Sequence, residues 1–566
     1  MTIPQHTRDP DSRRASSCLP RIVAVFILIG SVALGVWNAA VHTPWNEPPS
    51  RPATAAEPRI PHTAVSPYSA NTFLSQEVEP WKREKTVEML SLAGISWIKE
   101  GFPWSEIEPS EGSFWDPEFQ QDSWQKYDEI VDLAEEYGIR IIARLDHTPE
   151  WARPEGSGFH TPPSDPALYG RFVEAFVERY SGRIQYIQIW NEPNLAREWG
   201  GEIDPNGYFE LLREAYVGAK SADPEVVVLS APMAMTNEHS ERAIPEFDYW
   251  EALYDLGAGD YFDVLTATGY GIDQAPDEEP SHDVINLRRI ELLRDVLEDY
   301  GDSEKPIWLT EYGWNAAPDS IPEDELEWGS VSVEEQAEWT AGGIRWMSEN
   351  WEWFGVSSIW YFRQVGMIPP DAPEYYFAMV DLEFTPRQVY LTVQNDALER
   401  RTALPGTYAP LEAPVQQFGT WSRFNDPAAR FGESIRSDSA GSEIRIEFTG
   451  TDLSIETSQH ASSAGRAYIS LNGSPAQASL YDVDDEGRTY LALDDLAEAN
   501  DPVTLVERYG TDRPQETNEL RIVLDTDSAM SVSSISVEHN RSYGLFGLLA
   551  AVSGAGLLLS GLLFRR

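Results

Sequence analysis

The chain has 566 residues, which is too long for one ordinary domain, so two or more domains are expected. Hydrophobic residues make up 42% of it, with 20 Trp, 24 Tyr and 21 Phe, and this content excludes global disorder. A net charge of −51 excludes nucleic acid as a partner, because phosphate binding needs concentrated Lys and Arg. The single cysteine, Cys18, excludes an intrachain disulfide.

The N-terminal segment is expected to hold the chain at a membrane. Residues 1–21 are polar and basic, and residues 22–41 are almost wholly apolar. A stretch of about twenty apolar residues is long enough to cross a bilayer as a helix, and the basic side of such a helix stays in the cytoplasm. A signal peptide that is later removed is the alternative. Residues 42–62 are rich in proline, which is typical of an extended spacer.

A second apolar stretch lies at the other end of the chain. It covers residues 543–564 and is followed by Arg565 and Arg566. The same charge rule places these arginines inside the cell. Both ends therefore predict a transmembrane helix at the cell membrane, with the long middle segment outside the cell. A sorting tail that is cut off is the alternative, although the sequence has no diagnostic motif for one.

Short apolar runs alternate with segments of helical periodicity between residues 63 and 402. The apolar runs are Thr63–Tyr68, Ile95–Lys99, Ile139–Leu145, Ile184–Trp190, Val226–Ala231, Tyr261–Ala267, Pro306–Glu311 and Val356–Phe362. The helical segments are Arg83–Ala93, Gln125–Tyr137, Ala167–Tyr180, Gly207–Ala219, Tyr249–Leu256, Val284–Tyr300, Val333–Asn350 and Pro386–Arg400. Glycines stand just past several helix ends, as C-terminal capping favours: Gly94, Gly138, Gly182 and Gly301.

This alternation predicts an α/β fold in which a parallel sheet closes into a (β/α)8 TIM barrel. A doubly wound open sheet is the alternative, but no glycine-rich phosphate-binding motif follows the first apolar run. Residues 403–420 are proline-rich and predict a linker. Over residues 421–540 the helical alternation is absent and short apolar strands predict an all-β sandwich. These strands are Ile444–Phe448, Leu453–Ile455, Ala467–Leu471, Thr489–Leu493, Val503–Val506, Leu520–Leu524 and Ser531–Val537.

The fourth apolar run ends in a candidate catalytic carboxylate. Pro193 has no N–H for a strand ladder and restricts the residue before it, so Glu192 is expected where a buried strand becomes a loop. A carboxylate at such a mouth is half-buried, and its pKa is open to tuning. A turn acid or helix cap that follows a core strand is the alternative interpretation.

The seventh apolar run ends in a second glutamate, Glu311. Active-site groups of a (β/α)8 barrel stand at the C-terminal ends of its strands, so Glu192 and Glu311 are expected on one rim. Two carboxylates flanked by aromatic residues are the elements of glycoside hydrolysis, in which one must be protonated and the other ionised. In so acidic a chain, this interpretation depends on the position of the two residues and not on their type.

Two motifs resemble those of a known group. Trp-Asn-Glu-Pro-Asn at 190–194 and Leu-Thr-Glu-Tyr-Gly-Trp at 309–314 are similar to the acid/base and nucleophile motifs of retaining clan A glycoside hydrolases, families 39 and 5 in particular. Phe-Pro-Trp at 102–104 and Thr-Pro-Glu-Trp at 148–151 support the likeness, which covers roughly residues 63–400. The C-terminal region has short pieces similar to the jelly-roll domains that accompany glycosidases. Such a domain would bind sugar or act as a rigid spacer.

The resemblance implies roles for individual residues. Glu192 would be the general acid and then the general base, and Glu311 would be the nucleophile. Asn191 would hydrogen-bond the 2-hydroxyl of the sugar, Tyr270 would orient Glu311, and Trp360 would stack on the sugar ring.

Further substrate-binding residues follow from the same likeness. His147 would bind a hydroxyl or support the acid, although a single histidine is more often structural. Lys99 stands on the second strand where many relatives have Arg, and Thr268 stands on the sixth where family 39 often has His. Trp104 and Trp151 are candidate sugar-stacking residues near the rim.

Together these features predict an O-glycosyl hydrolase that cleaves a β-glycosidic bond of an oligo- or polysaccharide by double displacement. A catalytically inactive glycan-binding or adhesion protein and a transglycosylase are the alternatives. No cofactor is expected. No metal is expected either, because the nine His show no paired ligand spacing.

Overall fold

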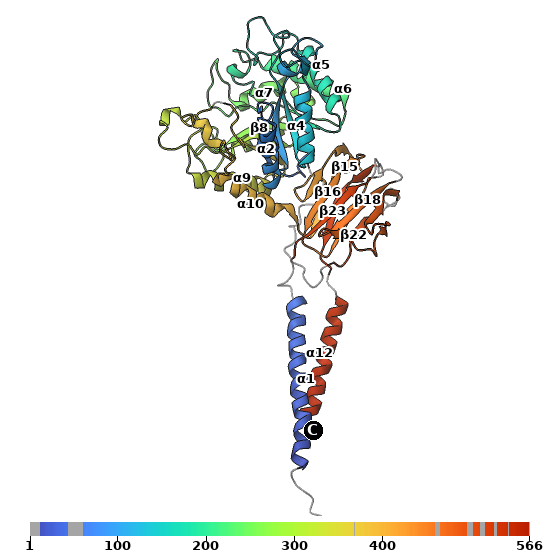
Figure 1. The fold of residues 1–566 in the computed structure, drawn as a ribbon. Coiled ribbons are helices and arrows are strands. Elements are labelled where there is room, and N and C mark those ends of the chain that lie inside the picture. The colour runs from blue at the N-terminus through green and yellow to red at the C-terminus, as the bar shows by residue number, and fades with distance from the viewer. Residues whose placement is uncertain are drawn as a thin grey trace, which may run out of the picture.

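The computed structural model describes residues 12–42, 60–366, 368–458, 465–494, 502–509, 516–525, 529–540 and 543–564. A barrel lies at one end of the molecule, a β-rich region packs against it, and two terminal helices extend away from both (Figure 1).

Eight parallel strands form the barrel in the order in which they occur along the chain. They are β1 (Tyr68–Asn71), β2 (Trp97–Pro103), β5 (Arg140–Asp146), β6 (Tyr186–Ile189), β7 (Val227–Leu229), β8 (Leu265–Tyr270), β9 (Ile307–Gly313) and β10 (Phe354–Ile359). Two isolated parallel bridges, Leu229–Val264 and Met233–Ala267, join the edges of the sheet at β7 and β8. The predicted (β/α)8 barrel is confirmed.

Helices cover the outside of the barrel, one after each strand (Figure 1). They are α2 (Pro80–Leu92), α4 (Gln125–Glu136), α5 (Pro166–Tyr180), α6 (Pro205–Ala222), α7 (Glu246–Asp255), α8 (Arg289–Asp299), α9 (Val333–Asn350) and α10 (Gln388–Arg401). The four glycines predicted to follow helices have left-handed φ values between 69° and 87°, as C-terminal capping requires. Ser332 and Glu335 form a capping box at the start of α9.

Short elements interrupt the connections. Helix α3 (Trp104–Ile107) and the hairpin of β3 (Trp115–Asp116) and β4 (Gln121–Asp122) lie between β2 and α4. The 3-10 turns are η2 (Ala196–Glu198), η3 (Ala258–Tyr261), η4 (Glu323–Glu325) and η5 (Pro373–Phe377).

The first strand begins later than the sequence predicts. β1 starts at Tyr68 rather than at Thr63, because the segment before it pairs with the C-terminal region instead of with the barrel. The N–H of Ser66 donates to the carbonyl oxygen of Leu411 at 2.9 Å. The first part of this apolar run therefore pairs with the C-terminal region, and its end forms a strand of the barrel.

An aromatic layer fills the lower barrel. Trp97, Tyr186 and Trp308 lie at or near the starts of β2, β6 and β9 and are at most 2% exposed. The ring of Tyr186 lies 5.0 Å from that of Trp97 and 5.0 Å from that of Trp308. This layer shares one hydrophobic cluster with Leu411 and Ile435 of the C-terminal region. The C-terminal region thus closes the floor of the barrel, and a substrate must approach at the opposite end of the strands.

The C-terminal region is rich in β-strands, as predicted. Its strands are β11 (Thr402–Ala403), β12 (Gly406–Tyr408), β13 (Val415–Phe418), β14 (Ser422–Asn425), β15 (Glu433–Ser437), β16 (Glu443–Phe448), β17 (Asp452–Glu456), β18 (Arg466–Leu471), β19 (Ser474–Pro475), β20 (Asp482–Val483), β21 (Thr489–Ala492), β22 (Val503–Val506), β23 (Asn518–Leu524), β24 (Met530–Val532) and β25 (Ser534–Glu538). The main sheet has the order β11-β16-β23-β18-β21-β20, and a second has the order β12-β25-β17-β22.

These two sheets share one hydrophobic core, to which Ile446 of β16 and Ile455 of β17 belong. The stretch 403–420, predicted to be a linker, contributes β12 and β13 to the sheets, where they pair with β25 and β16. Its prolines lie between strands and do not mark a free connection.

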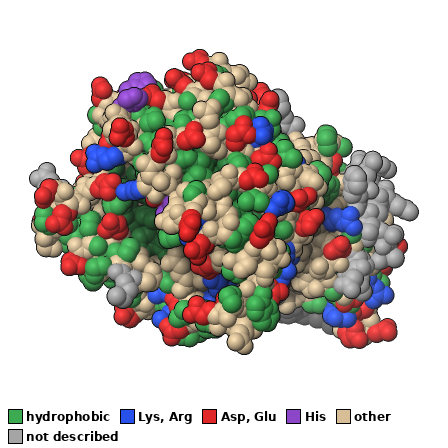
Figure 2. Space-filling view, turned by 90° about the horizontal axis from the view of Figure 1, so that it is seen from above, with side chains coloured by type: hydrophobic (Ala, Val, Ile, Leu, Met, Phe, Trp, Pro, Cys, Tyr) green, Lys and Arg blue, Asp and Glu red, His purple; other side chains and the backbone are tan. Residues whose placement is uncertain are grey.

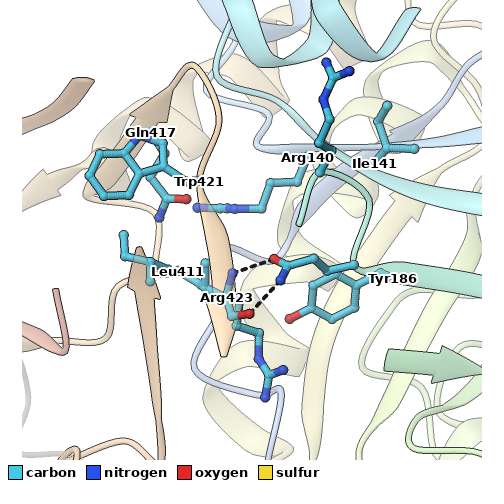
Figure 3. A pocket seen from close by; sticks show the side chains of 10 residues that line it. Arg140, Ile141, Tyr186, Leu411, Gln417, Trp421 and Arg423 are labelled. Carbon is cyan, nitrogen blue, oxygen red and sulfur yellow. Dashed lines mark hydrogen bonds between the residues drawn. The ribbon is translucent and has the colours of Figure 1, made fainter. Parts of the chain in front are cut away.

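The seam between the two domains is closely packed. The side chain of Gln185 forms two hydrogen bonds with the backbone of Arg423, at 2.6 Å and 2.7 Å (Figure 3). A Cβ atom at Gly138 would lie 2.7 Å from the carbonyl oxygen of Gln417. The cavity in Figure 3 has a volume of about 30 Å³, which suits a water molecule and not a sugar.

The terminal helices α1 (Ser12–His42) and α12 (Tyr543–Phe564) lie side by side (Figure 1). The hydroxyl of Ser553 donates a hydrogen bond to the carbonyl oxygen of Ser31 at 2.7 Å. Within the described residues, no helix has both the length and the apolar character needed to cross a membrane. The transmembrane helices predicted at residues 22–41 and 543–564 are therefore not supported. Most of the predicted spacer, residues 43–59, lies outside the described residues.

Candidate active site

A register shift in β9 turns Glu311 into the barrel. Trp308 faces the interior, so strict alternation would place Glu311 on the outer face of the strand. Between Leu309 and Glu311, however, two residues of β9 oppose one residue of β8. The next residue, Tyr312, points outward, because its hydroxyl donates to the carbonyl oxygen of Thr340 in α9 at 2.8 Å. Irregularities of this kind occur next to active sites, where they redirect a side chain.

Two side chains hold the carboxylate of Glu311. The ammonium of Lys99 lies 3.0 Å from Oε1, and the hydroxyl of Tyr270 donates to Oε2 at 2.9 Å. Lys99 lies on β2, Tyr270 is the last residue of β8, and all three residues are buried. Both oxygens of Glu311 are thus fixed by groups from two other strands.

The second glutamate lies in the loop that follows β6. Glu192 is half-buried and has a left-handed φ of 42°. Its N–H donates to the carbonyl oxygen of Pro232 at 3.0 Å, and its own carbonyl oxygen accepts from the N–H of Leu195 at 3.0 Å. Trp190 also has a left-handed φ, of 71°. Such backbone conformations are costly for residues other than glycine and are concentrated at functional sites.

The electrostatic surroundings keep Glu192 protonated. Burial, the nearby charge of Glu311 and then that of Glu198 raise the pKa of Glu192 to about 8, against the weaker opposing charges of Arg197 and Lys99. At neutral pH the carboxyl group therefore carries a proton that it can donate. Glu311, in contrast, is paired with an ammonium. The two glutamates have the opposite environments that an acid and a nucleophile require.

Asn191 lies beside the acid with an unused polar atom. Its amide oxygen is buried and has no hydrogen-bond partner within the described residues. Asn194, in contrast, fixes the loop, because its amide group bonds the backbone of Ala234 and Ile244 at 2.9 Å each. Asn191 is thus free to bond a substrate hydroxyl.

Aromatic side chains gather on the Glu311 side. Trp360 follows β10 directly and is half-buried. Its ring lies 5.8 Å from that of Phe73, and the ring of Tyr270 lies 5.7 Å from that of Phe377. Phe377 also contacts Trp328, with 6.1 Å between ring centroids. Only Trp360 and Tyr270 of this cluster are predicted from the sequence.

Two of the predicted tryptophans have different positions. Trp104 is 0% exposed and stacks on Phe172 of α5, with 5.4 Å between ring centroids, so the prediction that it stacks on sugar is wrong. Its position after a strand resembled that of a rim residue, but its ring packs in the core against Tyr169 and Phe172 of α5. Trp151 is half-buried, lies 5.5 Å from Trp104 and donates to the carbonyl oxygen of Glu108.

His147 lies next to β5 in a ring cluster. It has a left-handed φ of 60°, and its ring is 4.5 Å from that of Phe159 and 5.1 Å from that of His160. Burial lowers the pKa of His147, so its imidazole is neutral at neutral pH.

Sequence reasoning missed a half-buried cation, Arg144. Its Nε lies 2.8 Å from Oδ2 of Asp146. Arg144 follows Ile142 by two residues on β5, and Ile142 belongs to the cluster that fills the barrel. A charged residue at a position where alternation points into the barrel was the signal that would have identified it.

A hollow with hydrophobic side chains in its walls is visible in Figure 2, and acidic side chains predominate on this face of the molecule.

Comparison with known proteins gives distant likenesses. No family model matches the chain. Endoglucanase A of Ruminococcus albus is 22% identical over 227 residues, which are 38% of this chain and 60% of the relative. The chain thus matches less than two thirds of that relative's length.

Three solved structures are similar at low identity. A family 39 glycoside hydrolase from Bacteroides cellulosilyticus WH2 is 16% identical, with 83% of each chain covered and a TM-score of 0.46. A β-xylosidase from Caulobacter crescentus CB15 is 15% identical, with 83% of this chain and 98% of that chain covered and a TM-score of 0.45. A family 39 enzyme from Xanthomonas axonopodis pv. citri is 15% identical, with 88% and 99% covered and a TM-score of 0.44.

Proposed function

We propose that this protein is a retaining glycoside hydrolase in which Glu192 is the general acid and base and Glu311 is the nucleophile. The observation that supports it most is the contrast between the two glutamates. Glu192 has a raised pKa, whereas the carboxylate of Glu311 is held by Lys99 of β2 and Tyr270 of β8. Retaining hydrolysis needs one carboxylic acid and one carboxylate across the scissile bond.

In the first step, Oε of Glu311 attacks the anomeric carbon while Glu192 gives its proton to the glycosidic oxygen. The bond between the anomeric carbon and that oxygen breaks, the leaving group departs as an alcohol, and a glycosyl ester forms on Glu311. Tyr270 and Lys99 orient the carboxylate during the attack. Asn191 bonds the 2-hydroxyl, a contact that strengthens at the transition state.

In the second step, water attacks the anomeric carbon and Glu192 accepts its proton. The ester has removed the negative charge of Glu311, which is the largest charge effect that raises the pKa of Glu192. The pKa of Glu192 therefore falls when the ester forms, and the same residue changes from acid to base. Release of Glu311 as a carboxylate restores both the starting charge and the raised pKa.

The substrate we propose is a β-linked oligo- or polysaccharide. The names of the similar proteins, an endoglucanase and a β-xylosidase, support this class. The aromatic cluster of Phe73, Tyr270 and Trp360 offers the apolar surface on which a sugar ring stacks. We also propose that the barrel acts outside the cell, where polysaccharides are found, and protease treatment of intact cells tests that location.

A covalent trap tests the reaction. A 2-deoxy-2-fluoro glycoside with a good leaving group slows both steps and allows the ester to accumulate. Mass spectrometry of the digested protein should show one added sugar on the peptide that contains Glu311. Labelling of another residue, or complete inertness towards a broad panel of aryl β-glycosides, contradicts the proposal.

A further inference from the structure

Two loops meet beside Glu192 and fix each other. One follows β5 and carries Phe159 and His160, and the other follows β6 and carries Glu198. Nδ1 of His160 lies 3.3 Å from Oε2 of Glu198. Gly200 has a left-handed φ of 74°, and a Cβ atom there would lie 2.9 Å from the methyl group of Thr161. The two loops are therefore in direct contact, and only glycine permits this approach.

The two loops meet at a junction, from Phe159 to Thr161 and from Arg197 to Gly200. Some of its side chains are exposed to solvent. Phe159 is 46% exposed, and its ring contacts those of His147 and His160, at 4.5 Å and 4.4 Å between centroids. Arg197 is exposed, and its Nε lies 3.7 Å from Oε1 of Glu198. An exposed phenylalanine among charged and polar groups offers one apolar face and several hydrogen-bonding groups to a ligand.

The junction is held close to the acid. The indole N–H of Trp190 donates to the carbonyl oxygen of Glu198 at 2.9 Å, and Leu195 N–H donates to the carbonyl oxygen of Glu192. The loop from Glu192 to Glu198 is thus short and anchored at both ends. The charge of Glu198 raises the pKa of Glu192 and that of Arg197 lowers it.

We propose that Phe159, His160, Arg197 and Glu198 form the subsite for the leaving group, and that this group is an uncharged sugar. The inference rests on the proposed function and deepens it. A general acid must lie about 2.6–3.2 Å from the oxygen it protonates. The group attached to that oxygen therefore lies on the Glu192 side of the site, where these four residues are.

The chemistry of the four residues selects the leaving group. A sugar ring has an apolar face that fits Phe159, and its hydroxyls pair with imidazole, guanidinium and carboxylate groups. An anionic sugar is disfavoured, because the charge of Glu198 offsets that of Arg197 in the subsite and the chain carries a net charge of −51. The substrate is therefore a neutral oligo- or polysaccharide, and the other half of the site, with Trp360, holds the sugar that is transferred.

Two substrates that share the transferred sugar test this subsite. One is a neutral β-linked disaccharide that the wild-type protein hydrolyses, and the other is the corresponding β-glycosyl fluoride, whose leaving atom is too small to reach the subsite. We expect Phe159→Ala to lower the ratio of the two kcat/KM values about tenfold in favour of the fluoride. Glu198→Gln should lower the same ratio at a pH well below the alkaline limb of this variant, where Glu192 keeps its proton and only the contact with the leaving group is lost. Tyr300→Ala is the matched control, because Tyr300 is 42% exposed at the end of α8, on the floor side of the barrel.

The outcomes separate the two proposals. A wild-type protein that hydrolyses no neutral β-linked disaccharide and no β-glycosyl fluoride of a broad panel overturns the glycosidase function and this inference together. If the wild-type protein hydrolyses both and the ratio stays within twofold in Phe159→Ala and Glu198→Gln, the subsite is refuted and the glycosidase function stands. A variant that fails to fold loses activity on both substrates, and Glu198→Gln, which preserves shape, then decides.

Discussion

The ammonium of Lys99 lies 3.0 Å from Oε1 of Glu311, and the two side chains are only 2% and 7% exposed. A buried ion pair of this kind does little for stability by itself, but removal of one partner leaves the other charge uncompensated. The pair joins β2 to β9 across the barrel, so it fixes the carboxylate at the point where we propose that it attacks the sugar.

We therefore predict that Lys99→Met lowers kcat/KM for an aryl β-glycoside about 100-fold, since 1.36 kcal/mol corresponds to tenfold and a broken buried pair costs several kcal/mol. Lys99→Arg is the matched control. It keeps the positive charge and should lose less than Lys99→Met. Steady-state kinetics on the purified variants measure both. Equal losses in the two variants would show that the shape of the side chain matters and its charge does not.

Replacement of Glu311 by a small residue should have a different effect on activity from replacement of Glu192. We predict that Glu311→Gly loses about 10⁴-fold or more of its activity on every substrate, because no other group forms the ester. Azide should restore turnover and give the glycosyl azide of inverted configuration. In Glu192→Ala, azide should instead attack the ester on Glu311 and give the azide of retained configuration.

Proton NMR of the glycosyl azides distinguishes the two configurations. The loss of kcat/KM in Glu192→Ala should be about 10²–10⁴-fold for a substrate with a sugar leaving group. It should be much smaller for a dinitrophenyl glycoside, because dinitrophenolate leaves without a proton. If the two variants gave the opposite azides, the roles of acid and nucleophile would have to be exchanged.

The raised pKa of Glu192 predicts the alkaline side of the pH profile. The acid must be protonated, so kcat/KM should be retained below about pH 8 and fall as the pH rises through the pKa of Glu192. The apparent value belongs to the Glu192–Glu311 pair. The charge of Glu198 raises this pKa and that of Arg197 lowers it.

Glu198→Gln should therefore move the alkaline limb to lower pH, and Arg197→Gln should move it to higher pH. Measurement of kcat/KM between pH 5 and pH 10 gives the alkaline limb of the wild type and of each variant. Shifts of the same sign in both variants would mean that the limb reports a different group.

The barrel follows from local signals in the sequence. Strand and helix periodicities are set within each segment, and glycines such as Gly94 and Gly138 mark helix ends because only glycine adopts the left-handed conformation without cost. The position of Glu192 just after a buried strand was predictable from the apolar run before it, although β6 ends at Ile189 and not at Pro193.

Other parts of the site depend on tertiary structure. Perfect alternation would turn Glu311 outward, and the register shift that redirects it is set by the pairing of β9 with β8. His160 and Glu198 are 38 residues apart in the numbering and meet only because two loops pack together. Trp104 looked accessible from its motif, but the packing of α5 against it buries the ring.

The hydrogen bonds of Gln185 at the seam between the barrel and the C-terminal sheets should stabilise the protein. Gln185 bonds both the N–H and the carbonyl oxygen of Arg423, so Gln185→Ala leaves two buried backbone groups unpaired. An unpaired buried group costs about 1–3 kcal/mol, and we expect Tm to fall by several degrees. Gln416→Ala is the matched control at the same seam, because both amide atoms of Gln416 lack a hydrogen-bond partner within the described residues.

Calorimetry of the two variants should therefore give a lower Tm for Gln185→Ala and little change for Gln416→Ala. The activity of both on an aryl β-glycoside should remain close to that of the wild type, since the seam lies at the floor of the barrel and the glutamates lie at the opposite end. Equal losses of Tm would show that the seam is stabilised by packing alone. A loss of kcat/KM in Gln185→Ala without a loss of Tm would instead show that the C-terminal sheets act on the catalytic end through the strands.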